Sequence, residues 1–169
     1  MERVEAMPVM FIPDCPEIII QNYQDMVYRI AFTHCRNTSD AQDITQEVFV
    51  YYLKKMPRLN GEEHLKAWLI RVTINITKSL LRSAWFNKTL PFSEQEASYD
   101  NDPAKTETYY AVISLPEKYR TVILLYYFED YSVREVAHLL GRTETSVQTQ
   151  LQRARAMLKD KLKEDWQND

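Results

Sequence analysis

Glycine occurs only twice in this chain of 169 residues, at Gly61 and Gly141. Tight β-hairpin turns depend largely on glycine, so a fold built from many hairpins would need more of it. Both glycines lie between segments whose apolar residues recur at helical spacing. Hydrophobic residues make up 45% of the chain and charged residues 27%, a balance that can form a core and excludes wholesale disorder. The sequence therefore predicts an all-α fold.

The spacing of apolar residues divides the chain into two helical domains joined by a linker. The first half is expected to hold three helices, at 17–36, 40–56 and from 65 to between 83 and 87. The second half has four helical segments, at 106–114, 116–128, 132–140 and 143–163. Between the halves, residues 88–105 contain two prolines, many small polar residues and no apolar periodicity, as is typical of a flexible linker. We therefore expect two small domains, at 17–87 and 106–166.

Two short motifs mark expected helix starts. Ser39 with Gln42, and Ser132 with Glu135, have the spacing of a capping box, in which a serine and the residue three positions later satisfy the free N–H groups of a first turn. The motifs predict that the second helix and the sixth helix start at these serines.

Charge alternates along the chain although the net charge is only −3. Residues 1–63 and 92–110 each carry a net charge of −4, whereas residues 64–90 carry +5 and residues 132–163 carry +4. Two separate basic segments are the pattern of a protein that touches nucleic-acid phosphates at two places. Two solvated helical faces would give the same pattern, so charge alone leaves both interpretations open.

The second basic segment has the spacing of a helix-turn-helix. Ala137, Gly141 and Val147 supply a small residue where two helices touch, a glycine that reverses the chain and an apolar anchor on the second helix. Early residues of a second helix that enters the major groove face the base edges, where glutamine can pair with adenine and arginine with guanine. We therefore predict DNA binding, with a purely structural helical hairpin as the alternative. The predicted base-reading residues are Gln148, Thr149, Gln152 and Arg153.

Later residues of the same helix are assigned other roles. The lysines Lys159, Lys161 and Lys163 lie too far along the helix to reach bases, so they suit phosphate attraction or solubility. The apolar residues are expected to belong to the core. These are Leu151, Met157 and Leu158.

The first domain offers two further candidate features. Asp40, Asp43 and Glu47 share one face of the second helix because they are three and four residues apart, and such a stripe can meet a basic partner or simply be solvated. No histidine stands at the spacing that would suggest a metal site with these acids. After the loop Leu59–His64, Trp68 suits either a core position or the wall of a pocket for an extruded base.

Three sequence runs together resemble the extracytoplasmic-function sigma factors of the sigma-70 family. The run SDAQDITQEVFVYYL (Ser39–Leu53) is similar to the segment by which these factors grip the clamp helices of RNA polymerase. The run RLNGEEHLKAWLIRVTINITKSLLR (Arg58–Arg82) is similar to the segment that melts and reads the −10 promoter element. The run LPEKYRTVILLYYFEDYSVREVAHLLGRTETSVQTQLQRARAMLK (Leu115–Lys159) is similar to the domain that reads the −35 element.

The resemblance implies residues for each of these three contacts. Those implied for core polymerase are Asp40, Asp43, Gln46 and Glu47. Those implied for the −10 element are Leu59, Asn60, Gly61, His64, Trp68, Arg71, Asn75 and Lys78. Those implied for the −35 element are Arg142, Thr145, Gln148, Thr149, Gln152 and Arg153. Because TSVQTQ (Thr145–Gln150) stands where the family usually has Gly-Thr-Val and basic residues, the preferred −35 sequence is left open.

The resemblance also implies the partners: core RNA polymerase, promoter DNA and an anti-sigma factor, whether membrane-bound or not. It implies no small-molecule substrate, cofactor or metal. A stand-alone helix-turn-helix regulator, with Ser39–Arg82 as a dimerisation or sensing domain, is the alternative. An enzyme based on His34, Cys35 or His64 is disfavoured, because nothing pairs these residues at a spacing that would activate a nucleophile or bind a metal.

Two remaining features bear on the cellular compartment. The chain has no run of about 18 apolar residues, and its start carries acids where a signal peptide would be basic, so we expect a cytoplasmic protein. Cys15 and Cys35 fit no paired metal-ligand spacing and are expected to be reduced packing residues. The role of residues 1–16 is left open.

Overall fold

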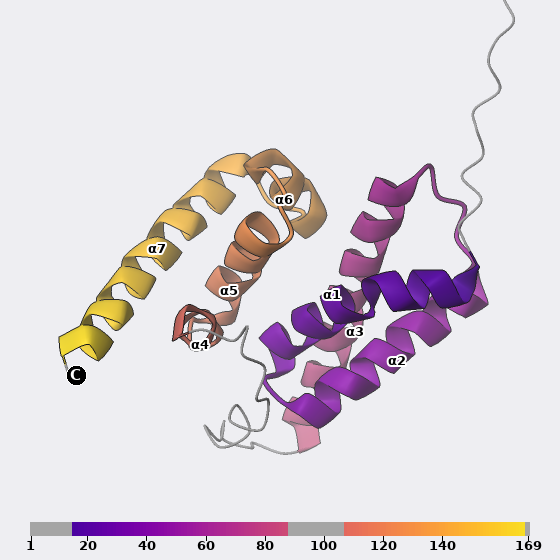
Figure 1. Ribbon diagram of the computed structural model, residues 1–169, viewed down its shortest axis with the longest axis horizontal. Coiled ribbons are helices and arrows are strands. Elements are labelled where there is room, and N and C mark those ends of the chain that lie inside the picture. Colours follow the sequence, from indigo (N-terminus) through magenta and orange to yellow (C-terminus); the bar gives the residue numbers. More distant parts are fainter. Residues whose placement is uncertain (1–14, 88–106, 168–169) are drawn as a thin grey trace, which may run out of the picture.

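The computed structural model describes residues 15–87 and 107–167, and the regular elements in both ranges are helices, as the sequence predicts. The expected linker at 88–105 lies outside the described residues. Figure 1 shows two helical units side by side, α1 to α3 in one and α4 to α7 in the other. No helix in the described part of the chain is both long enough and apolar enough to cross a bilayer.

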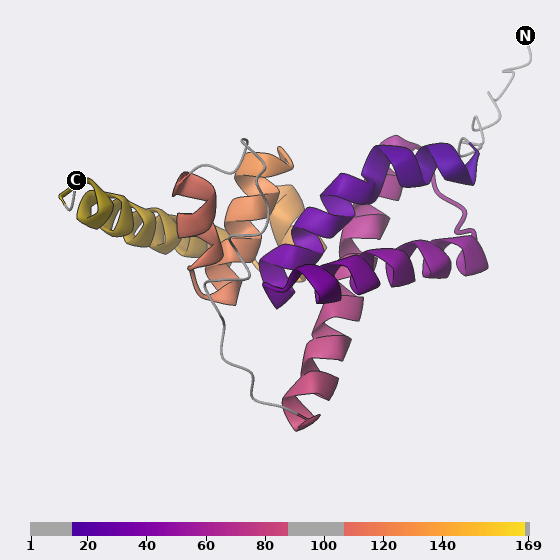
Figure 2. The same cartoon turned by 60° about the horizontal axis from the view of Figure 1, so that its bottom comes forward.

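The first unit consists of three long helices that all contact one another. They are α1 (Pro16–Cys35), α2 (Thr38–Lys55) and α3 (Glu62–Asn87). Apolar side chains on the inner face of each helix form the core, including Val27, Ile30, Ile44, Val48, Leu65 and Leu69. Helix α3 is the longest, and its C-terminal turns project beyond the other two helices in Figure 2.

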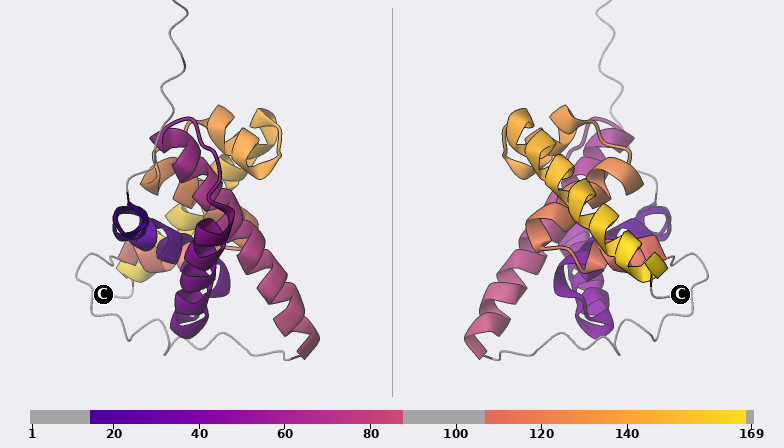
Figure 3. Two further views of the ribbon diagram at one scale, coloured as in Figure 1. Left: turned by 90° about the vertical axis from the view of Figure 1, so that its right-hand side faces the viewer. Right: turned by 90° about the vertical axis from the view of Figure 1, so that its left-hand side faces the viewer.

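The second unit is built from shorter helices against one long one. They are α4 (Glu107–Ile113), α5 (Glu117–Ile123), the π-helical turn η2 (Leu124–Phe128), α6 (Val133–Leu140) and α7 (Glu144–Gln167). Helix α7 contacts α4, α5 and α6, and Figure 3 shows it running along the outer side of this unit. Its core includes the buried residues Leu115, Val122, Leu125, Val136, Val147 and Leu151.

One of the two predicted capping boxes is confirmed and the other is wrong. The Ser132 hydroxyl accepts from the Glu135 backbone N–H at 3.3 Å, and the Glu135 carboxylate accepts from the Ser132 N–H at 2.8 Å. At α2, however, Asn37 is the cap, because its side-chain oxygen accepts from the Asp40 N–H at 2.9 Å. Asparagine is among the strongest cap residues, so the helix begins at Thr38 and includes Ser39 in its first turn.

Two expectations about packing residues are corrected. Met157 is 38% exposed rather than part of the core, although Leu151 is buried and Leu158 is partly buried as expected. Cys15 is exposed, at the start of α1, and its thiol donates to the Glu17 carboxylate. Cys35 is half-buried, and burial raises the pKa of its thiol to about 11. Cys35 alone therefore fits the expected packing role.

The two units also contact each other. Helix α1 packs against α5, and α3 packs against α6. Amphipathic patterns indicate which residues face a core, but they do not indicate which surfaces of two folded units contact each other. The sequence therefore did not predict this interface.

Candidate protein and nucleic-acid interfaces

The outer face of α2 combines carboxylates with exposed apolar side chains. Asp40, Asp43, Gln46 and Glu47 are all exposed there, as the sequence predicts. The residues that follow are 40–51% exposed and were not predicted as part of a site: Val50, Tyr51, Leu53 and Met56. A clue was present in the run Val48–Leu53, which is apolar around the whole helix although only one side can face the core. Charged and apolar residues together on one exposed face are typical of a protein-binding surface.

Helix α3 carries the predicted −10 residues along a single stripe. His64, Trp68, Arg71, Asn75 and Lys78 follow one another at intervals of three or four residues, so they share one face of the helix. His64, Arg71 and Asn75 are exposed, whereas Trp68 and Lys78 are half-buried. Arg82 continues the stripe and is exposed. The helix thus presents cations and an aromatic ring on one side over more than four turns.

The loop before α3 contributes the remaining predicted −10 residues. Asn60 is exposed, and Leu59 and Gly61 are half-buried. Gly61 adopts φ +103°, a conformation that side chains of L-residues rarely allow, and its carbonyl accepts from the Leu65 N–H at 3.2 Å. The glycine thereby turns the chain directly into α3.

Trp68 belongs partly to the core and partly to the surface. Its ring stacks on Tyr51 with a centroid distance of 5.9 Å and meets the edge of Tyr52 at 6.0 Å. These contacts fix the indole between α2 and α3, and the ring is only half-buried. Trp68 is therefore partly a core residue, whereas its role as the wall of a pocket for an extruded base stays a prediction.

A shallow cavity joins the α2 face to the α3 stripe. It has a volume of about 300 Å³, and its lining residues are Glu47, Tyr51, Val72, Asn75, Ile76, Ser79 and Leu80. Glu47 comes from the predicted polymerase set and Asn75 from the predicted −10 set. The two candidate surfaces of the first unit are therefore continuous.

The helix-turn-helix has the local geometry that its spacing predicts. Ala137 and Val147 are buried where α6 meets α7. Gly141 ends α6 in the left-handed conformation, with φ +62°. The Arg142 N–H then donates to the Ala137 carbonyl at 2.9 Å, which closes the turn before α7.

Five of the six predicted −35 residues lie on the first three turns of α7, Arg142 lies in the turn before it, and the six differ in exposure. Gln148, Gln152 and Arg153 are exposed, as is Thr145. Half-buried Thr149 donates its hydroxyl to the Thr145 carbonyl at 2.9 Å.

Two arginines near this surface have partners in the protein. Arg142 donates to the Gln150 amide oxygen at 2.7 Å, which braces it against the helix. The guanidinium of Arg153 lies close enough to the phenol of Tyr119 on α5 to lower the pKa of Tyr119.

The second unit also contains an apolar groove that the sequence did not predict. Its volume is about 880 Å³, and it runs between α4, η2 and α7. The apolar lining includes Val112, Ile123, Tyr127, Phe128, Leu158 and Leu162, and the cations at its sides are Arg155, Lys159 and Lys163. The guanidinium of Arg155 lies 5.9 Å from the centroid of the Tyr127 ring.

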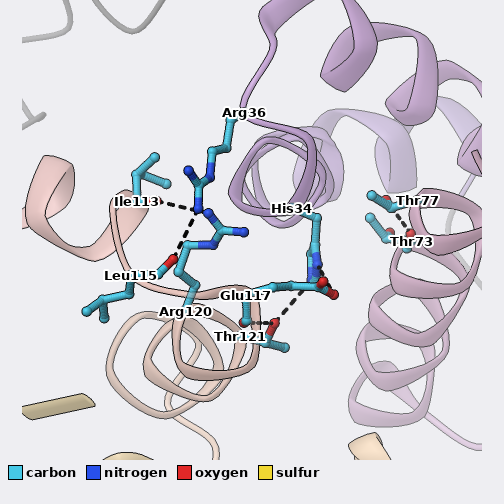
Figure 4. A network of polar contacts seen from close by, with 9 residues as sticks. All are labelled: His34, Arg36, Thr73, Thr77, Ile113, Leu115, Glu117, Arg120 and Thr121. Atoms are coloured by element: carbon cyan, nitrogen blue, oxygen red, sulfur yellow. Dashed lines mark hydrogen bonds and ion pairs between the residues drawn. The ribbon is translucent and has the colours of Figure 1, made fainter. Parts of the chain in front are cut away.

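Polar contacts connect the two units, as Figure 4 shows. The buried His34 ring on α1 donates from Nδ1 to the Glu117 carboxylate on α5 at 3.2 Å, which lowers the pKa of Glu117. Its Nε2 lies 3.4 Å from the Thr121 hydroxyl. Arg36 donates to the Leu115 carbonyl at 3.2 Å.

The group of His34, Glu117 and Thr121 has the residue types of a hydrolase triad, and no sequence motif predicted that these three residues meet. His34 and Thr121 are only 5% and 4% exposed, and Thr121 donates its hydroxyl to the Glu117 backbone carbonyl at 3.0 Å. Neither of the two cavities described above is lined by these residues. The described residues contain no group of three His, Cys, Asp or Glu side chains that could hold a metal ion. The geometry favours an interface contact over a reactive centre.

Comparisons with known proteins agree with the division into two units. The family model for sigma-70 region 2 matches residues 19–87, and the model for sigma-70 region 4 matches residues 107–158. The RNA polymerase sigma factor SigV of Bacillus subtilis is 29% identical over 153 residues, covering 86% of this chain and 90% of SigV. The ECF RNA polymerase sigma factor SigW of the same organism is 24% identical over 164 residues, covering 86% of this chain and 88% of SigW.

Solved structures show a similar fold. The sigma factor RpoE in complex with the anti-sigma factor NepR from Bartonella quintana superposes with a TM-score of 0.70 at 19% identity, covering 87% of this chain and 96% of RpoE. CnrH in complex with the cytosolic domain of CnrY superposes with a TM-score of 0.64 at 22% identity, covering 89% and 88% of the two chains.

Proposed function

Because this chain belongs to the sigma-70 family, whose members bind core RNA polymerase and direct it to promoters, we propose that three of its surfaces divide this work. The α2 face binds core polymerase, the α3 stripe binds the −10 element, and the start of α7 reads the −35 element. The observation that carries the assignment is the presence of region 2 and region 4 on one chain, each ending in an exposed helix with the expected residues. A stand-alone regulator would need only the second of these regions.

The α2 face suits a protein partner better than DNA. Its carboxylates Asp40, Asp43 and Glu47 repel phosphates, whereas a basic protein surface attracts them. The apolar residues that follow on α2 supply area to bury at the centre of an interface. We therefore assign Asp40, Asp43, Gln46 and Glu47 to the polymerase contact.

The α3 stripe suits single-stranded DNA. Arg71, Lys78 and Arg82 can neutralise backbone phosphates along one side of the helix. The partly exposed Trp68 ring and the loop before α3 can accommodate a base taken out of the stack. The start of α7, with Gln148, is instead shaped for duplex DNA.

We also propose that an anti-sigma factor controls this chain. The RpoE structure described above contains the anti-sigma factor NepR, and the CnrH structure contains the cytosolic domain of CnrY. The groove between α4, η2 and α7 is apolar with cations at its sides, so it fits an amphipathic helix that carries acidic residues. Since core polymerase and DNA are its partners, we place the protein in the cytoplasm, and we assign it no catalytic activity of its own, in keeping with its family.

The polymerase assignment predicts the effect of reversing charge on α2. Asp43→Lys combined with Glu47→Lys should abolish the complex with purified core polymerase in gel filtration, because two attractive contacts become repulsive. Circular dichroism should show unchanged helix content, since both side chains are exposed.

A matched control separates this site from charge in general. Asp43→Lys alone should weaken the complex, whereas Asp25→Lys on the exposed side of α1 makes the same charge change and should leave it intact. Normal binding by the double variant would show that α2 does not carry the polymerase contact.

A further inference from the structure

The side chain of Glu129 belongs to the second unit, yet Arg29 and Lys66, which contact its carboxylate, lie in the first unit. One carboxylate oxygen accepts from Arg29 on α1 at 2.8 and 3.1 Å. The other oxygen lies 3.4 Å from Lys66 Nζ on α3. The carboxylate is only 5% exposed, so it is almost fully removed from water by the contact between units. A buried carboxylate is stable only when cations compensate it, and here both cations come from across the interface.

The backbone around Glu129 is shaped to present it. Its N–H donates to the Leu124 carbonyl at 3.1 Å, five residues earlier, in the wide π-helical turn that ends the α5 segment. Asp130 then takes a left-handed conformation with φ +59°. Lys66 also donates to the Glu129 carbonyl at 3.1 Å and lies 5.1 Å from the centroid of the Tyr131 ring. One lysine therefore contacts both the side chain and the backbone of this turn.

The closed arrangement does not suit a protein that reads both promoter elements at once. The −10 and −35 elements are about 25 base pairs apart, which is about 85 Å of duplex at about 3.4 Å per pair. In the structure, α6 of the helix-turn-helix packs directly on α3, which carries the proposed −10 stripe. The longest helix, α3 with 26 residues, is only about 39 Å long.

We propose that Glu129 is a latch that holds the free protein closed through Arg29 and Lys66, and that it must release them before both promoter elements can be bound. The contacts between the two units are sufficient to infer that the free protein is closed. The effect of this closed arrangement on promoter binding depends on the function proposed above. Lys66 lies on the side of α3 away from the DNA stripe, so the latch leaves that stripe uncovered and fixes the distance between the two DNA sites.

Other contacts between the units include both attractive and repulsive ones. His34 with Glu117 and Arg36 with Leu115 add to the interface. Against them, Arg36 and Arg120 bring two like charges together across it, and burial followed by the charge of Arg36 lowers the pKa of Arg120 to about 10. Arg29 and Lys66 keep 37% and 31% of their side chains exposed, so water and salt can reach the latch.

The latch can be tested on the full chain by small-angle X-ray scattering at low salt. Glu129→Gln removes the charge but keeps the shape, and it should increase the radius of gyration by several ångströms. Asp130→Asn is the matched control, because it removes one negative charge from the next residue, which is exposed and in a conformation that asparagine tolerates. It should leave the protein as compact as the wild type.

Arg29→Gln breaks the same pair from the first unit and should expand the protein in the same direction, which keeps the test valid if Glu129→Gln disturbs folding. A Glu129→Gln protein that is folded and as compact as the wild type would overturn the latch. Equal expansion by Asp130→Asn would overturn it as well, because the effect would then be general charge.

Binding to core polymerase provides a second readout. If closure competes with assembly, Glu129→Gln should bind core polymerase several-fold more tightly than Asp130→Asn. Failure of every variant, the wild type included, to bind core polymerase would contradict the proposed function, while the scattering result would still decide whether the latch exists.

Discussion

At the scale of single residues, exposure separates side chains that are available for recognition from those already engaged. Gln148 and Gln152 on α7 are exposed and have the amide groups that pair with adenine. Arg153 is exposed and lies near the phenol of Tyr119, whose pKa it lowers, so its guanidinium is available to a guanine edge. Arg142 is braced on Gln150. We therefore expect Arg153 to add specificity while the glutamines adapt to the bases.

Substitution of Arg153 tests this assignment. Arg153→Ala should reduce the binding free energy by about 1 to 3 kcal/mol at the preferred −35 sequence and by much less on scrambled DNA. The reason is that only a matched base accepts the directional hydrogen bonds of the guanidinium. Lys161→Ala is the comparison, since a lysine that attracts phosphates should weaken both DNAs equally and lower the salt dependence by about one contact. Fluorescence anisotropy on both duplexes measures these losses. Equal losses from Arg153→Ala on both would make it a phosphate contact.

Residue types and spacing predicted much of the candidate site, but not its context. The sequence placed Asp43, Trp68 and Gln148 on helices, and the structure puts Asp43 and Gln148 on exposed faces. It could not show that Trp68 stacks on Tyr51, because that contact depends on how α2 packs against α3. Their roles in binding polymerase and DNA stay predictions.

At the scale of elements, helix starts depend on which polar side chain reaches the free N–H groups. Several residues near the start of α2 could cap this helix. The capping-box spacing predicted Ser39 as the cap, whereas Asn37 is the cap in the structure. The rule worked for α6 because Ser132 and Glu135 satisfy each other, with the Ser132 hydroxyl also donating to the Glu135 carboxylate at 2.7 Å. Helix type is thus predictable from periodicity, while the first residue depends on local competition.

The α6 cap predicts a change in stability. Ser132→Ala should lower the free energy of unfolding by about 1 kcal/mol at neutral pH, because it leaves a backbone N–H without its partner. Ser79→Ala, on the exposed side of α3, should be neutral or slightly stabilising, since alanine is the better helix former. Urea unfolding followed by circular dichroism distinguishes them. Equal stability of the two variants would mean that the cap contributes nothing.

The same cap predicts a pH dependence. Hydrogen bonds from the Ser132 N–H and hydroxyl lower the pKa of Glu135. The stabilisation that the Glu135 carboxylate provides should be complete above its pKa in the unfolded chain, which is about 4.3. It should be lost as the pH falls through the lower pKa of the folded protein. The stability difference between the wild type and Glu135→Gln should therefore be constant near neutral pH and shrink in acid. A difference that is independent of pH would show that the carboxylate charge has no role in the cap.

At the scale of the whole molecule, two small domains are joined by more than a linker. The sequence predicted the two helical units but not their contact, because Arg29 and Glu129 are 100 residues apart and each also suits a solvated surface. A long-range ion pair leaves no periodic signal. The same is true of His34 and Glu117, which are 83 residues apart.

Cleavage of the linker tests whether each unit folds independently and whether the two units stay in contact. Cutting at a protease site introduced between Ser93 and Ala104 should leave two folded fragments that stay associated at low salt. They should separate at high salt, because the pairs between units are partly exposed and therefore screened. Gel filtration at both salt concentrations reports association, and circular dichroism reports folding. Loss of helix in both fragments after cleavage would show that neither unit folds alone.

The most direct measurement is reconstituted transcription. Purified core polymerase should start transcription at a defined position on a promoter selected with this protein, and should not do so without it or with the Asp43→Lys and Glu47→Lys double variant. Scrambling the −35 or the −10 element separately should each reduce the transcript, because the second unit and the first unit are assigned one element each. The account would be contradicted if core polymerase with the wild-type protein gave no transcript from any selected promoter.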